Sequence, residues 1–590
     1  YRIHQPMVWG DWNEEFASTG PNLAVALRSD VPDFEEVTRL QAPGRHFISY
    51  QTDDGEQRAF RENKIFIAED NFFKIFSFPL LKGDPDQVLS SPLSVVITEE
   101  MAIKYFGDED PIGKTLKIEE ERGESRSFNV TGVTESLPTN SHIQFDMLTS
   151  MSSYPHIKRR EHQWMWTTFG TYGLVRADTD MEALETKIQA IPPKWAGVRA
   201  LGESFEDFVD GKEWTLSMQQ IKDAYIHAPA SGIRFGPSGD YTYVQIFGVI
   251  GVMILILSSI NFMNLSTARS EKRANEVGVR KAMGSGRTRL MIQFITEALM
   301  LAFIASLVSV LLLFVLLPQF NLLIEKDLVL GLFQPFHIIF LLGITLVCGI
   351  FAGLYPAFYL SSFKPVEVLK GLKVTQGSAN FIRKGLVVGQ FTISIVFIIC
   401  TILVFQQIQH VKNRALGFDK DQLISLNVNG TMIEKFDVIK QDLINSGAVS
   451  SVGLNNSGIL NGGNNGSNLT WTGGTDTEDV LIFFRYISSD FLETAGMELA
   501  EGHGFSENRA KDSSNVLITE SFAKLMGSGS AIGKKITRED TYTVVGVVKD
   551  YLFNDMYGKS DPVMFHNYHG EASFMYLKTN PNMAANDMLS

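Results

Sequence analysis

The sequence predicts a membrane protein in which a bundle of α-helical spans carries two α+β domains on one side of a lipid bilayer. Four long apolar runs lie between residues 243 and 405. Two loops rich in Lys and Arg separate these runs and give them one consistent orientation. A residue pattern that precedes the runs also recurs after them, which indicates an internal duplication.

Composition narrows the class of partner. The 590 residues include 66 Asp and Glu against 52 Lys and Arg, a formal net charge of −14. Nucleic-acid binding depends on basic surface, so this balance argues against nucleic acid as a partner. The two cysteines, Cys348 and Cys400, both lie inside apolar runs. The domains outside the lipid are therefore expected to contain neither disulfides nor cysteine-based metal sites.

Residues 1–242 are predicted to form the first outer domain, in which a strand, a helix, a turn and a second strand follow one another. Val95–Ile97 has the β-branched composition of a short strand. Thr98 is expected to cap the next helix, and Gly107 is expected to end it. Phe128–Val133 alternates in the manner of a returning strand. Together these elements predict an α+β fold.

The same pattern returns about 420 residues later, in a second outer domain predicted over residues 406–590. The first copy contains Val96-Ile97-Thr98-Glu99, Ile112-Gly113-Lys114 and Val130-Thr131-Gly132-Val133. The second contains Leu517-Ile518-Thr519-Glu520, Ile532-Gly533-Lys534 and Val544-Val545-Gly546-Val547. A duplication of this kind repeats a span together with its outer domain. The offset places one further span before Tyr1 and three after residue 590, so we expect this chain to be part of an eight-span protein.

Four runs have the length and composition of membrane-spanning helices. They are Tyr243–Leu265, Leu290–Leu317, Phe336–Leu360 and Leu386–Phe405. The first three are predicted to form one three-span domain over 243–360, and the fourth follows a linker at 361–385. Four such runs in so short a stretch favour a membrane bundle over buried helices of a soluble protein.

The loops between the spans set the orientation, because cytoplasmic loops are enriched in Lys and Arg. The loop 266–289 and the linker 361–385 are both basic, whereas Pro318–Pro335 has a single Lys beside two acidic residues. The basic residues of the first loop are Arg269, Lys272, Arg273, Arg280, Lys281, Arg287 and Arg289. Both basic segments are therefore predicted to be cytoplasmic. Residues 1–242 and 406–590 then both lie on the outer side of the membrane.

The first cytoplasmic loop contains the most specific motif of the chain. It reads Asn275-Glu276-Val277-Gly278-Val279-Arg280-Lys281-Ala282-Met283-Gly284-Ser285. This string, together with the duplicated outer-domain pattern, resembles the MacB/FtsX-type permeases of ABC systems in their duplicated eight-span form. The resemblance covers nearly the whole chain. The second loop, with Tyr355-Pro356-Ala357 and Pro365-Val366-Glu367-Val368-Leu369, resembles the family more loosely.

The resemblance implies a partner, because these permeases work with a nucleotide-binding ATPase that docks on their cytoplasmic loops. The residues predicted to form the docking loop are Glu276, Val277, Gly278, Arg280, Lys281, Ala282 and Gly284. The alternative interpretation is that the cations of this loop only hold the ends of the spans against anionic headgroups. A periplasmic adaptor or an outer-membrane component is a further possible partner.

Glu297 is the one carboxylate inside an apolar run, about two helical turns from the cytoplasmic boundary. A charge in lipid is costly, so it either hydrogen-bonds to a neighbouring helix or couples the bundle to the docked ATPase. No catalytic, cofactor or metal site is predicted. Gly107 and Gly113-Lys114-Thr115 approach a phosphate-binding loop, but five residues intervene instead of four and a helix precedes them.

The predicted function is that of a non-enzymatic permease subunit for export or mechanotransmission, with ATP hydrolysis in a separate partner subunit. Within the class, release of lipoproteins or control of cell-wall hydrolases are alternatives. From other classes, a membrane-anchored periplasmic sensor would need a cytoplasmic output domain, and a membrane hydrolase would need a nucleophile or a metal. Trp164, Trp166, Trp195 and Trp214 are either core residues of the first outer domain or a surface for an adaptor.

Overall fold

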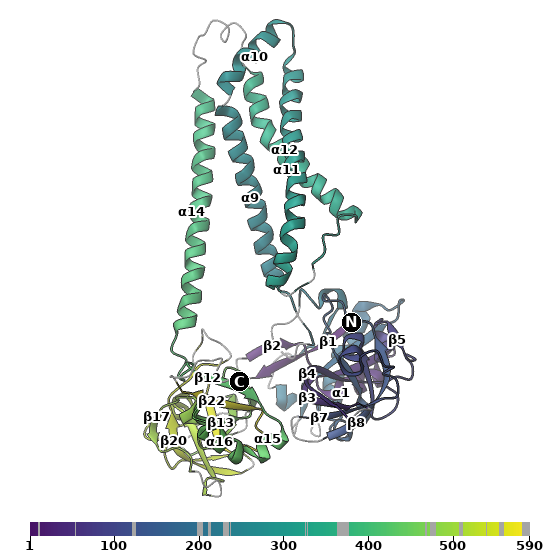
Figure 1. The fold of residues 1–590 in the computed structure, drawn as a ribbon, viewed down its shortest axis with the longest axis vertical. Helices are drawn as coiled ribbons and strands as arrows, with labels where there is room; N and C mark the ends of the chain where they lie inside the picture. Colours follow the sequence, from purple (N-terminus) through teal and green to yellow (C-terminus); the bar gives the residue numbers. More distant parts are fainter. Residues whose placement is uncertain are drawn as a thin grey trace. The chain divides into compact units, whose positions relative to one another are not determined.

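A computed structural model describes most of the chain. The described residues are 1–9, 12–52, 55–120, 125–197, 204–209, 214–227, 235–236, 238–268, 270–324, 326, 328–362, 377–466, 469–472, 480–506, 511–538, 540–553, 558 and 560–580. The chain divides into the outer residues, 1–239 and 413–590, and a helical part, 240–412. Each is described by itself (Figure 1).

The first outer domain is built on a mixed sheet with strand order β11-β1-β10-β3-β4-β9-β6-β8-β5, to which β2 and β7 add. The strands are β1 (Arg2–Trp9), β2 (Trp12–Phe16), β3 (Phe34–Gln51), β4 (Gln57–Ala68), β5 (Leu80–Lys82), β6 (Ser94–Thr98), β7 (Thr115–Glu120), β8 (Ser125–Thr134), β9 (Met147–Ser150), β10 (Phe169–Val175) and β11 (Ser217–Gln219). The helices are α1 (Pro21–Asp30), α2 (Phe72–Ile75), α3 (Glu99–Phe106), α4 (Pro155–Arg159), α5 (Met181–Gln189), α6 (Ile191–Trp195) and α8 (Phe205–Val209).

The predicted strand, helix and turn of this domain are confirmed. Strand β6 is buried throughout, as its β-branched composition requires. The Thr98 hydroxyl accepts the Met101 amide at 3.4 Å and so caps α3. Gly107 and Gly113 have φ values of 64° and 81°, a region that a residue with a Cβ rarely adopts. The near-match to a phosphate-binding loop is thus a helix end followed by a tight turn.

The second outer domain repeats this topology. Its strand order is β12-β22-β13-β16-β21-β18-β20-β19-β15, with β14 on β16 and β17 on β20. The strands are β12 (Leu423–Asn427), β13 (Val449–Asn455), β14 (Asn464–Gly466), β15 (Thr470–Trp471), β16 (Ile482–Ile487), β17 (Leu499–Gly502), β18 (Asn515–Thr519), β19 (Lys535–Thr537), β20 (Thr541–Val548), β21 (Val563–Asn567) and β22 (Phe574–Thr579). The helices are α15 (Gly430–Glu434), α16 (Phe436–Asn445), α17 (Phe491–Thr494) and α18 (Glu520–Leu525).

The pairing of the central strands confirms the internal duplication. Strand β6 pairs parallel with β8 and antiparallel with β9, and β18 pairs parallel with β20 and antiparallel with β21. Gly527 and Gly533, the counterparts of Gly107 and Gly113, have φ values of 84° and 80°. One detail differs, because Thr519 does not cap α18. Its hydroxyl instead accepts the Val563 amide at 2.9 Å.

The four tryptophans named in the sequence analysis lie in the core of the first outer domain or pack against it. Trp164 and Trp214 are buried, and their rings meet edge to face with centroids 6.0 Å apart. Trp166 packs against Phe169, and the Trp195 indole donates to Asp30. The interpretation of these residues as core is therefore the one that the structure supports.

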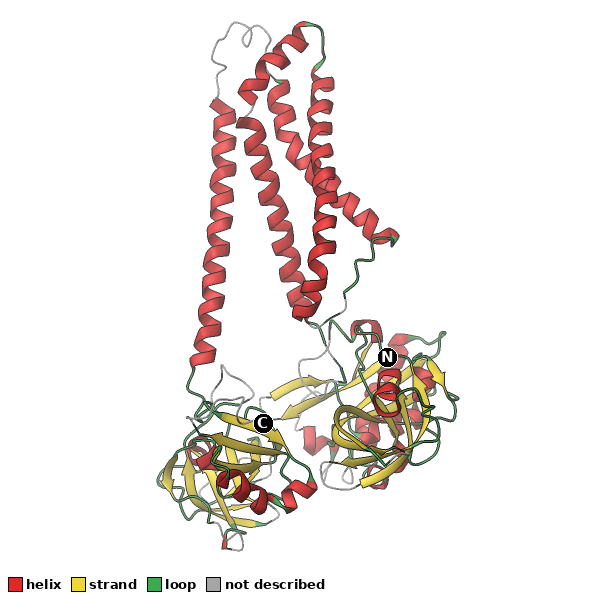
Figure 2. Ribbon diagram, viewed as in Figure 1, coloured by secondary structure: helices red, strands yellow, loops and turns green. Residues whose placement is uncertain are grey.

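Four helices of the helical part are long and apolar enough to cross a membrane, which confirms the predicted spans (Figure 2). They are α9 (Tyr241–Ala268), α11 (Arg287–Ile324), α12 (Pro335–Ser361) and α14 (Gly377–Asn413). Each is longer than its apolar run. Helix α11 continues through Pro318, where the predicted outer loop was expected to begin, because a spanning helix tolerates a proline when other groups satisfy the freed carbonyl. Of the predicted linker 361–385, residues 363–376 lie outside the described residues.

Glycines let two of these helices approach closely. A Cβ at Gly349 would lie 2.6 Å from Leu299 Cδ2, and a Cβ at Gly353 would lie 2.8 Å from the Ala298 Cβ. Both glycines are on α12 and both neighbours are on α11. Small residues spaced by four along a spanning helix are a common basis of helix association in lipid.

Buried histidines predict acid sensitivity of the outer domains. Burial lowers the pKa of His46, His142 and His566 to about 4. The unfolded chain binds these protons near pH 6.5, so stability falls as the pH drops from about 6.5 toward 4, by about 1.4 kcal/mol per pH unit per histidine. Two of the three lie in the first domain.

We therefore expect denaturant unfolding, followed by hydrogen exchange at pH 7 and pH 5.5, to show a steeper loss of stability in the first domain than in the second. His142→Gln is expected to reduce that slope. Equal slopes in the two domains would contradict the assignment.

Candidate functional site

Most of the motif in the loop between the first two spans lies on a helix, α10 (Ser270–Ala282). Gly284 follows it with a φ of 95°, so the chain can turn sharply into α11 at Arg287. The amide of Ser285 donates to the Arg280 carbonyl at 3.0 Å and closes the end of the helix. The predicted docking residues are thus brought together on one short helix and the turn behind it.

Two of the predicted docking residues face the bundle. The Val277 side chain is 2% exposed and packs with Leu290, Phe294, Ala357 and Leu360. Gly278, beside it, is also buried. Val277 thereby packs α10 against α11 and α12.

The basic pair of the motif also contacts the protein's own helices. Arg280 donates to Gln293 Oε1 of α11 at 2.6 Å and forms an ion pair with Glu276 at 2.7 Å. Lys281 donates to the carbonyl of Ser361, at the end of α12, at 2.6 Å. The two cations therefore link α10 to both neighbouring spans, which the sequence did not indicate.

Glu297 joins the same arrangement from α11. It forms an ion pair with Arg273 of α10 at 2.6 Å, and its other oxygen accepts the Gln293 amide at 3.2 Å. Glu276, Arg280, Gln293, Glu297 and Arg273 thus form a continuous chain of polar contacts, which we call the bracing network. A cavity lined by residues of α9, α10, α11 and α12 opens beside its Arg273–Glu297 end.

The outward face of α10 carries the residues that remain accessible. Val279 is 45% exposed and Met283 is 75% exposed, and Glu276 and Ala282 are exposed as well. Glu276, Val279 and Ala282 are each spaced by three residues and so share one face of α10, and the exposed Met283 follows directly after the helix ends. We call these four residues the outward stripe. Val279 and Met283 were absent from the predicted docking residues, although this spacing was readable in the sequence.

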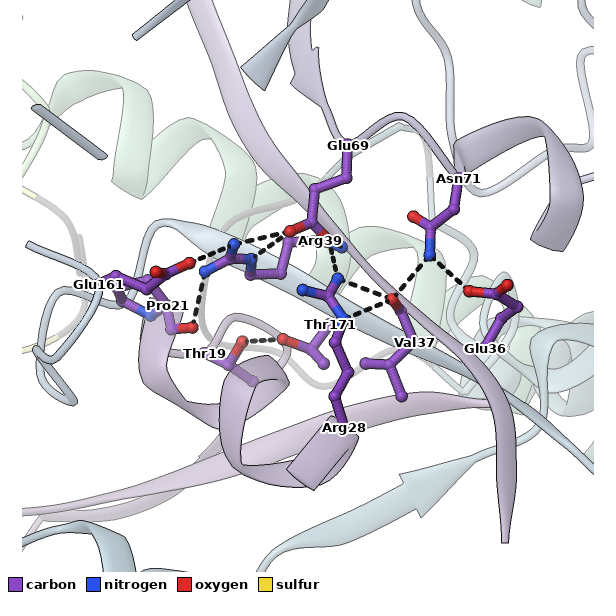
Figure 3. Close-up of polar contacts among 10 residues, drawn as sticks. All are labelled: Thr19, Pro21, Arg28, Glu36, Val37, Arg39, Glu69, Asn71, Glu161 and Thr171. Atoms are coloured by element: carbon purple, nitrogen blue, oxygen red, sulfur yellow. Dashed lines mark hydrogen bonds and ion pairs between the residues drawn. The ribbon is translucent and has the colours of Figure 1, made fainter. Parts of the chain in front are cut away.

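The densest polar cluster of the first outer domain is structural (Figure 3). The Arg39 side chain is buried, and its Nη2 lies 2.6 Å from Glu69 Oε1 and 2.7 Å from Glu161 Oε1. Arg28 also pairs with Glu69. Burial alone would raise the pKa of Glu69, but the charges of Arg39 and Arg28 hold it below its ordinary value. Glu69 and Glu161 are thus both paired with arginines, and these ion pairs hold distant parts of the domain together.

Metal-ligand types do not gather elsewhere in the part of the chain that the structure describes, where no group of three or more His, Cys, Asp or Glu is placed to hold a metal ion. His566 lies among aromatic rings. Its ring centroid is 5.1 Å from that of Tyr486 and 4.9 Å from that of Tyr542. The cytoplasmic helix α10 is therefore the site on which a functional argument can be built.

Comparison with known proteins adds to this description. Residues 3–191 and 388–588 match the family described as MacB-like periplasmic core domain, and residues 248–365 match the family described as FtsX-like permease C-terminal. The chain is 26% identical over 290 residues to a macrolide export ATP-binding/permease protein MacB of Bdellovibrio bacteriovorus, covering 47% of this chain and 39% of that protein. It is 30% identical over 128 residues to the protein of that name in Agrobacterium fabrum, covering 22% of this chain and 19% of that protein. These alignments span less than half the length of the relatives.

Solved structures are also similar to parts of the chain. The periplasmic region of MacB from Actinobacillus actinomycetemcomitans has 14% identity and a TM-score of 0.22, covering 30% of this chain and 83% of that one. The extracellular domain of the noncanonic ABC-type transporter YknZ from Gram-positive bacteria has 13% identity and a TM-score of 0.23, covering 37% of this chain and 100% of that one.

Proposed function

Since this chain belongs to the MacB/FtsX-type permeases of ABC systems, we propose that it relays the ATP-driven motion of a partner ATPase from its cytoplasmic helix to its periplasmic domains. It is a permease of the bacterial inner membrane, in which four apolar helices are long enough to span the bilayer. In this proposal ATP is hydrolysed in the partner subunit, and the periplasmic domains act on a substrate or an adaptor.

The outward stripe is the observation that carries the proposal. It includes two exposed apolar side chains, Val279 on α10 and Met283 directly after its end, in a loop predicted to face the cytoplasm, where burial against a partner would be favourable. An amphipathic helix presented in this way suits a hydrophobic groove on another protein. The flexible thioether of Met283 suits such a groove because it adapts to irregular surfaces.

We further propose that the bracing network carries the movement inward. Arg280 and Lys281 attach α10 to α11 and α12, and Glu297 attaches it again through Arg273. A displacement of α10 would therefore move both spans rather than bend the loop. Glu297 takes the coupling role in this scheme.

Docking is tested with the double variant Val279→Glu, Met283→Glu, purified in detergent from the native membrane. Charges on the outward stripe should weaken ATPase binding by at least about 30-fold, the equivalent of one hot-spot contact of about 2 kcal/mol. Ile103→Glu is the matched control, since Ile103 is 62% exposed on α3 of the first periplasmic domain. Recovery of the ATPase, measured by mass spectrometry and ATP turnover, should be normal for the control. Equal recovery with both variants would refute docking on this face.

The bracing network is tested by charge reversal in the same preparation. Glu297→Arg should leave ATPase recovery unchanged but remove the ATP-dependent movement of the periplasmic domains. The double variant Arg273→Glu, Glu297→Arg should restore the ATP-dependent movement, because the ion pair is re-formed with its two charges swapped. A single variant that retains full movement would remove the coupling role of Glu297.

A further inference from the structure

The segment that leads from the first periplasmic domain into α9 is fixed to the domain by an aromatic side chain. Phe235 lies shortly before α9 begins at Tyr241, and its side chain is 2% exposed. Its ring centroid is 5.9 Å from that of Phe66 and 6.5 Å from that of Tyr172. The Arg2 guanidinium carbon lies 5.7 Å from the same centroid. Phe235 thus occupies a socket in the core of the domain.

The backbone of this segment is fixed as well. The Gln144 amide donates to the Phe235 carbonyl at 2.9 Å, and the Gly239 amide donates to the Tyr225 carbonyl at 2.7 Å. A Cβ at Gly236 would lie 2.8 Å from the His142 carbonyl oxygen, so the chain runs directly against the domain there. The segment is therefore held at two points, and Asp240 alone separates the second point from α9.

The attachment matters because the segment between Phe235 and α9 has the composition of a flexible linker. Residues 236–239 read Gly-Pro-Ser-Gly. A linker rich in Gly and Ser behaves as a flexible coil and transmits neither thrust nor rotation. Because Phe235 and Gly239 are held by the domain, almost no free linker remains between the domain and the span. Movement of α9 then reaches the domain body through these contacts.

The entry to the second periplasmic domain has the same kind of attachment. After α14 ends at Asn413, the Leu416 carbonyl accepts the Leu552 amide at 2.8 Å. The Asp419 amide donates to the Ala495 carbonyl at 2.8 Å. Gly417 lies against the Asp550 carbonyl with a φ of 82°. Both described links between a span and a domain are thus bonded to the domain they serve.

We propose that Phe235 is the positioning residue through which the first periplasmic domain receives force from α9. This role rests on the proposed function, in which the spans drive the periplasmic domains. The force path enters the domain body at the socket, and it does not continue along the chain that precedes Phe235.

Two matched insertions test the path. A flexible Gly-Ser segment is placed either between Gly239 and Asp240, on the span side of the anchor, or between His227 and Ala228, on the domain side. The readout is energy transfer between a label at Ile103→Cys and the membrane of a nanodisc, with the co-purified ATPase and ATP plus vanadate. Cys348→Ser and Cys400→Ser remove the native thiols.

The span-side insertion is expected to abolish the ATP-dependent change, and the domain-side insertion to preserve it. Loss with both insertions would mean that force runs along the chain past Phe235, and retention with both would mean that it bypasses the linker. Either result overturns the proposal. ATP turnover should remain in every variant, because the docking helix is untouched.

The anchor itself is tested without ATP. Phe235→Ala should accelerate hydrogen exchange of the Gln144 and Gly239 amides while the β6 amides stay protected, and Phe235→Leu should accelerate it less. Gly170→Val should reproduce the effect, since a Cβ at Gly170 would lie 2.8 Å from the Phe235 ring and compete for the socket. If hydrogen exchange rises throughout the domain, or at no amide, the proposal that Phe235 anchors the segment is wrong. If the unmodified protein shows no ATP-dependent change, the proposed function fails, and this measurement alone decides whether the anchor exists.

Discussion

Replacing Arg39 by Met is expected to destabilise the first periplasmic domain by about 3–5 kcal/mol. The Arg39 side chain is 5% exposed, and Glu69, against which it lies, is 11% exposed. Removing the guanidinium leaves the Glu69 carboxylate in a poorly solvated position, with Arg28 as its remaining cation and the backbone amide of residue 39 as a further donor. An unpaired buried charge costs more than the ion pair contributed, which is why the loss is large.

The measurement is denaturant unfolding of the full chain, followed by hydrogen exchange of the β6 amides. Lys187→Met is the matched control, because Lys187 pairs with Asp33 at the domain surface and is 47% exposed. An exposed pair contributes about 0–1 kcal/mol, so this control should change little. Arg39→Met combined with Glu69→Leu should recover part of the loss, since the poorly solvated Glu69 carboxylate is then gone and the carboxylate that still loses Arg39 is Glu161, whose side chain is 35% exposed to solvent. A single variant as stable as the control would show that solvent reaches Glu69 after all.

Features of the fold that depend on neighbouring residues could be predicted from the sequence, whereas features that depend on contacts between distant residues could not. The β6–α3 unit was readable because each of its signals is local: a β-branched strand, a capping threonine and two glycines in turns that need a positive φ. The Arg39 cluster was not readable. Arg39 meets Glu69 and Glu161 across 30 and 122 residues of sequence, and only the completed sheet brings them together.

The candidate site likewise has features that could be predicted from the sequence and features that could not. The short helical stretch between two spans could be predicted from the sequence, but the orientation of each of its side chains depends on helices α11 and α12. Val277 and Val279 have the same chemistry, yet one is buried in the bundle and the other is exposed. The resemblance assigned the basic pair to a docked partner, with anionic headgroups as the alternative contact. In the folded protein Arg280 reaches Gln293 and Lys281 reaches Ser361, which are distant in sequence.

The contacts of Arg280 with α11 and of Lys281 with α12 require that these two spans lie close together. A large loss of stability is therefore expected from a substitution where the backbones of α11 and α12 meet. Gly353→Leu should lower the apparent melting temperature of the protein in nanodiscs by several degrees. The added Cβ alone would lie 2.8 Å from the Ala298 Cβ and 3.2 Å from the Ile295 Cα. Neither atom is the mobile end of a side chain, so the helices must separate. Overpacking of this kind costs about 1–3 kcal/mol or more.

Gly343→Leu on the same helix is the matched control for this substitution. A Cβ at Gly343 would meet no atom within 4 Å, and the position is exposed where lipid would surround it. Leucine there replaces a poor helix former by a good one and places an apolar side chain in lipid, so stability should be unchanged or slightly higher. Separation of α11 from α12 in Gly353→Leu should also pull Ser361 away from Lys281, so that ATP turnover by the bound ATPase persists without movement of the periplasmic domains. Equal melting temperatures for the two leucine variants would mean that α11 and α12 do not pack through this glycine in the membrane.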